Sequence, residues 1–136
     1  MKVVIIYDSA QDVPFMEPAR GYFNEAEVSY EETILSAHQN LDELITYLAK
    51  LEEKGDKAVI LTVASLATAL PSVVATKISL PVIGVPVPSG PLNGMDALLS
   101  MSQLPGGVGS TTVGLHPKAC VNAAMSAHRI LNLVGT

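Results

Sequence analysis

The sequence predicts an α/β domain built on an open parallel sheet with right-handed crossovers. Continuous apolar, β-branched runs such as Lys2–Tyr7 and Ala58–Val63 are typical of strands buried on both faces of a parallel sheet. Amphipathic or small-residue segments alternate with these runs at the spacing of strand–helix units. The length of 136 residues fits one domain, which we place over residues 1–136.

The first strand is expected over Lys2–Tyr7, followed by a turn rich in Asp, Ser and Gln. A helical stretch is then expected from Pro14 to about Asn24, and Pro18 inside it should kink or shorten it. Glu27–Leu35 alternates between apolar and polar residues, which predicts the second strand.

The next helix is the best marked one in the sequence. Asn40 and Glu43 have the spacing of a capping box, with Asn40 as N-cap. Lys54-Gly55 supplies a stop at the other end. Five apolar residues fall on one helical face: Leu41, Leu44, Ile45, Leu48 and Leu51.

The second half continues the alternation of strands and helices. Ala58–Val63 is the third strand, and a small-residue helix is expected to run through Ala75. The remaining elements, in order, are a strand at Pro81–Val85, a helix at Asn93–Met101, a strand at Thr111–Leu115 and a helix at Pro117–Leu133.

Composition excludes several classes of protein. Hydrophobic residues make up 49% and charged residues 15%, which excludes intrinsic disorder. No apolar run approaches the roughly 20 residues of a membrane span, and the N-terminus does not resemble a signal peptide. A single cysteine, Cys120, cannot form a disulfide or a zinc site by itself, so a cytoplasmic location is expected. The net charge of −5 argues against a nucleic-acid partner.

The charges are unevenly distributed. Residues 1–57 carry twelve of the thirteen acidic side chains and five of the eight basic ones. The rest of the chain has Lys77, Asp96, Lys118 and Arg129 and no other charged side chain. Four charged side chains cannot cover the solvent-exposed face of a small monomer. We therefore expect an obligate homo-oligomer whose subunit contacts are made mainly by the second half of the chain.

Ligands of open parallel sheets bind at the carboxyl ends of the strands. Here those ends are residues 8–12, 36–40, 62–69 and 86–91, and three of them precede a helix whose free N–H groups can hold an anion. By spacing alone, Ser9 and Asp12 could equally be ordinary N-cap residues, and His38 could be a solvated loop residue. No metal-ligand spacing, nucleophile elbow or phosphate-binding glycine loop is present in the sequence.

Three segments carry a resemblance to a known family: Ser36-Ala37-His38, Pro81–Val87 (PVIGVPV) and Leu92–Val108 (LNGMDALLSMSQLPGGV). They resemble the phosphoribosylaminoimidazole carboxylase catalytic-subunit family, whose bacterial type is the 5-(carboxyamino)imidazole ribonucleotide mutase. The resemblance runs from Val3 to about Leu131. It implies a flavodoxin-like three-layer sandwich with a five-stranded parallel sheet and an octameric assembly. It further implies a phosphoribosyl aminoimidazole substrate and no metal, ATP or organic cofactor.

The resemblance also assigns roles to residues. His38 matches the general acid/base that moves the ring-carbon proton while carbon dioxide is held in the pocket, a role that suits an imidazole with an unperturbed pKa of about 6.5. Ser9 and Asp12 match a serine that contacts phosphate and an aspartate that holds the ribose hydroxyls. The expected substrate-binding residues are Ser9, Asp12, Ser36, Ala37, Gln39, Ser65 and Ser89.

Several positions depart from the family pattern. Gln39 replaces an arginine that binds phosphate, and Asp8 replaces a glycine. Residues 63–69 (VASLATA) replace a glycine-rich segment that ends in histidine. We therefore expect an enzyme that moves a carboxylate on the usual ribonucleotide or on a related heterocycle, with weakened phosphate binding. The alternative is a diverged paralogue that takes a less anionic ligand or serves as a non-catalytic oligomeric binding protein.

Overall fold

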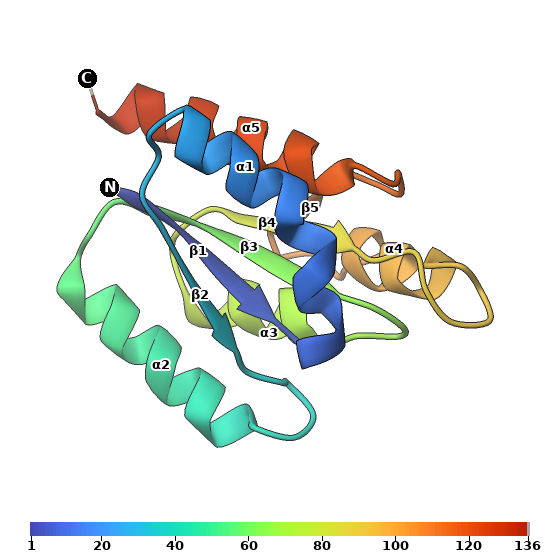
Figure 1. The fold of residues 1–136 in the computed structure, drawn as a ribbon. Helices are drawn as coiled ribbons and strands as arrows, with labels where there is room; N and C mark the ends of the chain where they lie inside the picture. Colours follow the sequence, from blue (N-terminus) through green and yellow to red (C-terminus); the bar gives the residue numbers. More distant parts are fainter. Residues whose placement is uncertain (136) are drawn as a thin grey trace.

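The computed structural model describes residues 1–135 and places five parallel strands side by side in the order β2-β1-β3-β4-β5 (Figure 1). This is the flavodoxin-like order, so the predicted fold class is confirmed. The expected domain ends at Thr136, which lies outside the described residues. The elements in chain order are β1 (Lys2–Tyr7), the 3-10 helix η1 (Ala10–Met16), α1 (Glu17–Glu25), β2 (Tyr30–Ile34), α2 (Leu41–Lys54), β3 (Ala58–Ala64), α3 (Leu70–Lys77), β4 (Val82–Pro86), α4 (Met95–Ser102), β5 (Thr111–Thr112) and α5 (Ala119–Val134).

The sheet separates two cores. Val3, Ile5 and Tyr7 of β1 pack in the cluster that contains α1 and α5, whereas Val4 and Ile6 pack in the cluster with α2 and α3. This alternation follows from the two-residue period of a strand, and it explains why β1 is apolar throughout. Figure 1 shows α1 and α5 side by side on one face and α2 and α3 on the other.

Helix α4 packs beside β4 and β5. The contact depends on Gly84, because a Cβ built at this position would lie 2.8 Å from the sulfur of Met101. Three apolar side chains remain exposed in the single chain: Leu92, which precedes α4, and Met95 and Leu99, which belong to it. In the described residues, 1–135, no helix combines the length and the apolar character needed to cross a membrane.

The first helical region differs from the prediction. The chain forms η1 before α1, and Pro18 lies at the first positions of α1, so the α-helix begins at Glu17 and is shorter than the predicted stretch from Pro14. A proline fits there because the first N–H groups of a helix have no intrahelical acceptor.

The predicted helix over residues 41–54 is confirmed, and Gly55 ends it with φ 68°, but the capping box is wrong. Asn40 has φ −130° and ψ 39°, and its side chain makes no cap hydrogen bond. An N-cap residue usually needs extended backbone to aim its side chain at the first turn. Leu41 also departs from the prediction, since it is 41% exposed at the helix start while Leu44 is fully buried.

The last strand is shorter than expected. β5 covers Thr111–Thr112 and does not reach Leu115. Gly114 has φ 79°, which turns the chain out of the ladder before it enters α5. The other strands begin or end one to three residues from their predicted bounds, apart from β1, which has the bounds predicted for it.

Candidate active site

The loops that follow β1, β2, β3 and β4 meet at one edge of the sheet, because all four strands run in the same direction (Figure 1). Backbone hydrogen bonds carry the ladder into these loops. The N–H of Asp8 donates to the carbonyl of Val63 at 3.0 Å, and that of Val87 donates to Ala64 at 2.9 Å. The substrate-binding candidates of the sequence therefore lie at this edge, Asp12 in η1 and the others in the loops.

The Asp8 carboxylate connects three of the loops. Its Oδ1 accepts a hydrogen bond from the backbone N–H of Ala37 at 3.1 Å. Its Oδ2 accepts one from the hydroxyl of Thr68 at 3.5 Å. The same hydroxyl accepts the N–H of Leu70 at 3.1 Å, at the start of α3. Asp8 thus does more than add charge where the family pattern has glycine: it fixes the turn that carries His38.

Ser36 orients the catalytic candidate. Its side chain is buried, and its Oγ accepts the backbone N–H groups of His38 and Gln39, both at 3.2 Å. Such serine turns fix the backbone locally without a helix or strand. His38 and Gln39 are exposed and line a surface hollow of about 310 Å³ at the start of α2, which also contains Asp42 and Glu43. The backbone of His38 is therefore fixed by a hydrogen bond, while its side chain is exposed.

Asp12 is the buried acid of the site. It lies in η1 and is 2% exposed. Burial raises the pKa of its carboxyl; hydrogen bonds to Ser65 oppose that shift, and the nearby negative charge of Asp8 adds to it. Its Oδ2 has no hydrogen-bond partner among residues 1–135. A buried carboxylate oxygen without a donor is costly, so this atom is a ready acceptor for a donor from a ligand.

The remaining serines lie around this pair of acids. Ser9 is the N-cap of η1, where its Oγ accepts the N–H of Gln11 at 3.3 Å. Ser65 is half-buried and bonds Asp12, which links the loops after β1 and β3. Ser89 is half-buried in the loop after β4, where its N–H donates to Val87 at 2.9 Å. Asp8, Asp12, Ser65 and the Ser36 turn are therefore joined, and Ser89 comes from a separate loop.

Leu66 narrows the space between the loops after β3 and β4. Its φ of 63° lies in the left-handed region, which is rare for a bulky side chain. The side chain is 50% exposed, and a Cβ built on Gly90 would lie 2.6 Å from its Cδ2. Leu66 therefore has a backbone conformation that favours glycine, and its side chain occupies the space next to Gly90.

The electrostatic character of the edge is acidic. Residues 8–12, 36–40, 65–69 and 86–91 contain no lysine or arginine, whereas Asp8 and Asp12 both belong to them. Within residues 1–135, no group of three His, Cys, Asp or Glu side chains is placed to hold a metal ion. An open imidazole, backbone N–H groups at the start of α2, and a buried acceptor suit proton transfer on a small polar molecule.

Sequence reasoning missed two features of this edge. Thr68 was not singled out, although a threonine two residues before a helix that begins Leu70-Pro71 is a common turn and cap signal. Arg20 was also missed; its guanidinium forms ion pairs with Glu17 and Glu32. It is the one basic residue between Lys2 and Lys50 in an acidic half of the sequence, which marks it as a candidate for a buried ion pair.

Comparisons with known proteins cover nearly the whole chain. Residues 2–135 match the model of the AIR carboxylase family. The chain is similar to the N5-carboxyaminoimidazole ribonucleotide mutase of Bacillus subtilis (strain 168), with 43% identity over 96% of this chain and 80% of the relative. It is 42% identical to the mutase of Pyrococcus abyssi over 97% of this chain and 74% of that one. Among solved structures, Treponema denticola PurE superposes with a TM-score of 0.85 at 27% identity, covering 96% of this chain and 80% of that one.

Proposed function

The chain belongs to the AIR carboxylase family, and we propose that it is an N5-carboxyaminoimidazole ribonucleotide mutase of purine biosynthesis. The observation that carries the proposal is the open imidazole of His38, on a turn fixed by Ser36 and Asp8. Similar proteins from Bacillus subtilis and Pyrococcus abyssi carry the name of this mutase, which favours the mutase over direct carboxylation or a lyase reaction and over a non-catalytic binding protein.

In the proposed reaction the carboxylate moves from the exocyclic nitrogen to the neighbouring ring carbon. The N–C bond breaks, protonated His38 gives its proton to the nitrogen, and the carbon dioxide released stays in the pocket. The ring carbon then forms a C–C bond to carbon dioxide, and His38 removes the proton from that carbon. Substrate and product have the same atoms and oxidation level, so the reaction balances without a metal, a nucleotide or an organic cofactor.

The other loop residues bind the substrate in this proposal. Ser9, the N-cap of η1, contacts the phosphate through its hydroxyl. The Oδ2 of Asp12, which has no partner in the part of the chain that the structure describes, accepts a hydrogen bond from a ribose hydroxyl. Because this oxygen is shielded, a ligand must displace a neighbouring group to reach it. The residues that line the rest of the pocket are Ser36, Ala37, Gln39, Ser65 and Ser89.

We further propose that the enzyme is a cytoplasmic homo-oligomer, most simply an octamer as in the family. Support comes from the apolar surface around α4, where Leu92, Met95 and Leu99 are 60%, 47% and 49% exposed. The charge-poor second half of the chain carries this surface. Light scattering at micromolar concentration should give a mass several times 14.3 kDa.

A labelled substrate tests the reaction. The protein is incubated with N5-carboxyaminoimidazole ribonucleotide that carries ¹³C in the carboxylate, and the label is followed by NMR. We expect the label to appear on the ring carbon faster than in buffer alone. Binding without any transfer of label would support the non-catalytic alternative and would overturn the mutase assignment.

A further inference from the structure

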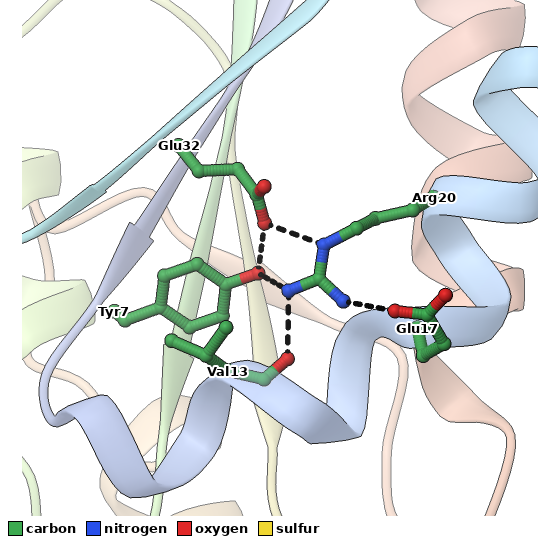
Figure 2. A network of polar contacts seen from close by, with 5 residues as sticks. All are labelled: Tyr7, Val13, Glu17, Arg20 and Glu32. Atoms are coloured by element: carbon green, nitrogen blue, oxygen red, sulfur yellow. Dashed lines mark hydrogen bonds and ion pairs between the residues drawn. The ribbon is translucent and has the colours of Figure 1, made fainter.

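A network of polar contacts lies next to the site, on the side of β2 and η1. Figure 2 shows it, with the guanidinium of Arg20 pointing into a ring of oxygen atoms. The participating residues are Tyr7, Val13, Glu17, Arg20 and Glu32. None of them belongs to the proposed substrate-binding set, so the network needs its own explanation.

All three nitrogens of the Arg20 guanidinium are used. Nε donates to Oε1 of Glu32 at 2.9 Å, and Nη1 donates to Oε2 of Glu17 at 2.9 Å. Nη2 donates to the hydroxyl of Tyr7 at 3.0 Å and to the backbone carbonyl of Val13 at 2.8 Å. The Arg20 side chain is 15% exposed. Only the planar fork of an arginine can make these bonds at once, since a lysine presents one point charge.

Tyr7 gives the network a rigid base. It is the last residue of β1, is 1% exposed, and precedes Asp8. Its hydroxyl donates to Oε1 of Glu32 at 2.5 Å, on β2, and accepts from Arg20. The end of β1 and the middle of the neighbouring strand β2 are therefore joined to the guanidinium through the side chains of Tyr7 and Glu32.

The fourth bond reaches the site. Val13 directly follows Asp12 in η1, so the carbonyl held by Arg20 belongs to the residue next to the buried acid. A short 3-10 helix has weaker internal hydrogen bonding than an α-helix and depends more on external contacts. Arg20 thus ties the segment that carries Asp12 to β1 and β2.

We propose that Arg20 is a positioning residue, which holds η1 against the sheet and so sets where the Asp12 carboxylate meets the substrate. Its contribution to turnover rests on the proposed function, in which Asp12 accepts a ribose hydroxyl. Its effect on η1 does not depend on any substrate. A residue that positions the ribose contact, far from the reacting ring carbon, affects ground state and transition state alike.

The test compares Arg20→Met, Arg20→Lys and Glu17→Gln in the full-length protein. Glu17→Gln is the matched control, because it changes a partner of the same guanidinium at an end that is 79% exposed. The first readout is hydrogen exchange by mass spectrometry without ligand. We expect exchange in the peptide spanning residues 8–16 to rise at least tenfold in Arg20→Met and Arg20→Lys, and to stay within twofold in the control and in residues 41–54 of all variants.

The second readout is the kinetics of the mutase reaction. We expect KM to rise at least tenfold in Arg20→Met while kcat stays within threefold, whereas lost folding would lower kcat in proportion to the inactive fraction. Unchanged exchange in residues 8–16, or exchange raised equally along the chain, would overturn the proposal. A wild-type protein without turnover would instead refute the proposed function, and the exchange result would still decide the role of Arg20.

Discussion

The loops after β2 and β3 end at the same edge of the sheet but are held in different ways. The loop after β2 is fixed by hydrogen bonds that its backbone N–H groups donate. Those of His38 and Gln39 donate to the Ser36 hydroxyl, and that of Ala37 donates to the Asp8 carboxylate. The loop after β3 contains Leu66, which keeps a left-handed conformation and stays half-exposed. The first loop holds the turn that carries His38, and the second places Leu66 against Gly90 in the loop after β4.

We expect the loop after β2 to determine the rate of proton transfer and the loop after β3 to determine which ligands bind. The polar loop retains the Ser-Ala-His segment of the family pattern and should retain proton transfer. The loop after β3 and the exchange of arginine for Gln39 should change which ligands fit and how tightly they bind. Variants in the two loops should therefore affect different kinetic parameters, and their effects should differ in size.

The largest effect is expected for His38→Asn. Loss of a general acid/base lowers kcat by about 10²- to 10⁴-fold, while the oligomer and the thermal unfolding midpoint remain unchanged because the ring is exposed. His128→Gln is the control: His128 bonds Tyr22 at 2.8 Å, in contacts between α1 and α5, and the variant should keep wild-type turnover. Near-normal kcat in His38→Asn would remove His38 from the mechanism.

A smaller effect is expected for the charge at the phosphate position. Gln39→Arg combined with Asp8→Asn restores positive charge and keeps an oxygen that accepts the Ala37 N–H. Because a charge-assisted hydrogen bond contributes roughly 1.5–3 kcal/mol, affinity for aminoimidazole ribonucleotide should rise about 10- to 150-fold and become more sensitive to salt. Titration calorimetry at two salt concentrations measures both changes.

The matched comparison for this double variant is Gln39→Arg with Asp8→Gly. Glycine leaves the N–H of Ala37 without its acceptor, so the turn that carries His38 loosens. We expect a smaller gain in affinity and a lower kcat than in the asparagine form. Equal kinetics for the two double variants would show that Asp8 acts only through its charge.

Asp12→Asn should weaken substrate binding and increase the free energy of unfolding at neutral pH. Burial raises the pKa of Asp12 in the folded protein, so the folded state resists ionisation more than the unfolded chain does. The wild type then loses stability relative to the variant as pH rises through that pKa, and the difference vanishes in acid, where both states hold the proton. Urea unfolding at several pH values measures this, and a difference that grows toward acid would contradict it.

The smallest effect is expected for Leu66→Gly. Relief of a left-handed leucine gains about 1–3 kcal/mol, and the entropy of glycine costs roughly 0.5–1 kcal/mol. The variant should therefore be more stable by about 1 kcal/mol, and its KM should fall as room opens beside Gly90. Leu66→Ala keeps a Cβ and should not gain this stability. A less stable glycine variant would show that packing of the leucine outweighs the strain.

The sequence predicted the sheet because its strands are apolar on both faces and its helices carry clear stops such as Gly55. It predicted which loops meet, because parallel strands place their carboxyl ends together. It did not predict the link from Asp8 to Thr68 or the Arg20 network, since such contacts join residues up to 60 positions apart and depend on side-chain direction. Asn40 is the N-cap of α2 as predicted, but its side chain makes no cap hydrogen bond, because the backbone angles at this residue decide whether the side chain reaches the first turn.

Proton exchange at the ring carbon tests the central claim most directly. The ribonucleotide carboxylated at that carbon is incubated with the protein in D₂O, and the products are examined by NMR. Loss of carbon dioxide into the pocket should be followed by deuteration of the carbon, with His38 delivering the deuteron. We expect deuterium in the N-carboxylated product and in free aminoimidazole ribonucleotide with the wild type, and no incorporation above buffer with His38→Asn. Equal incorporation by both proteins would contradict proton transfer by His38.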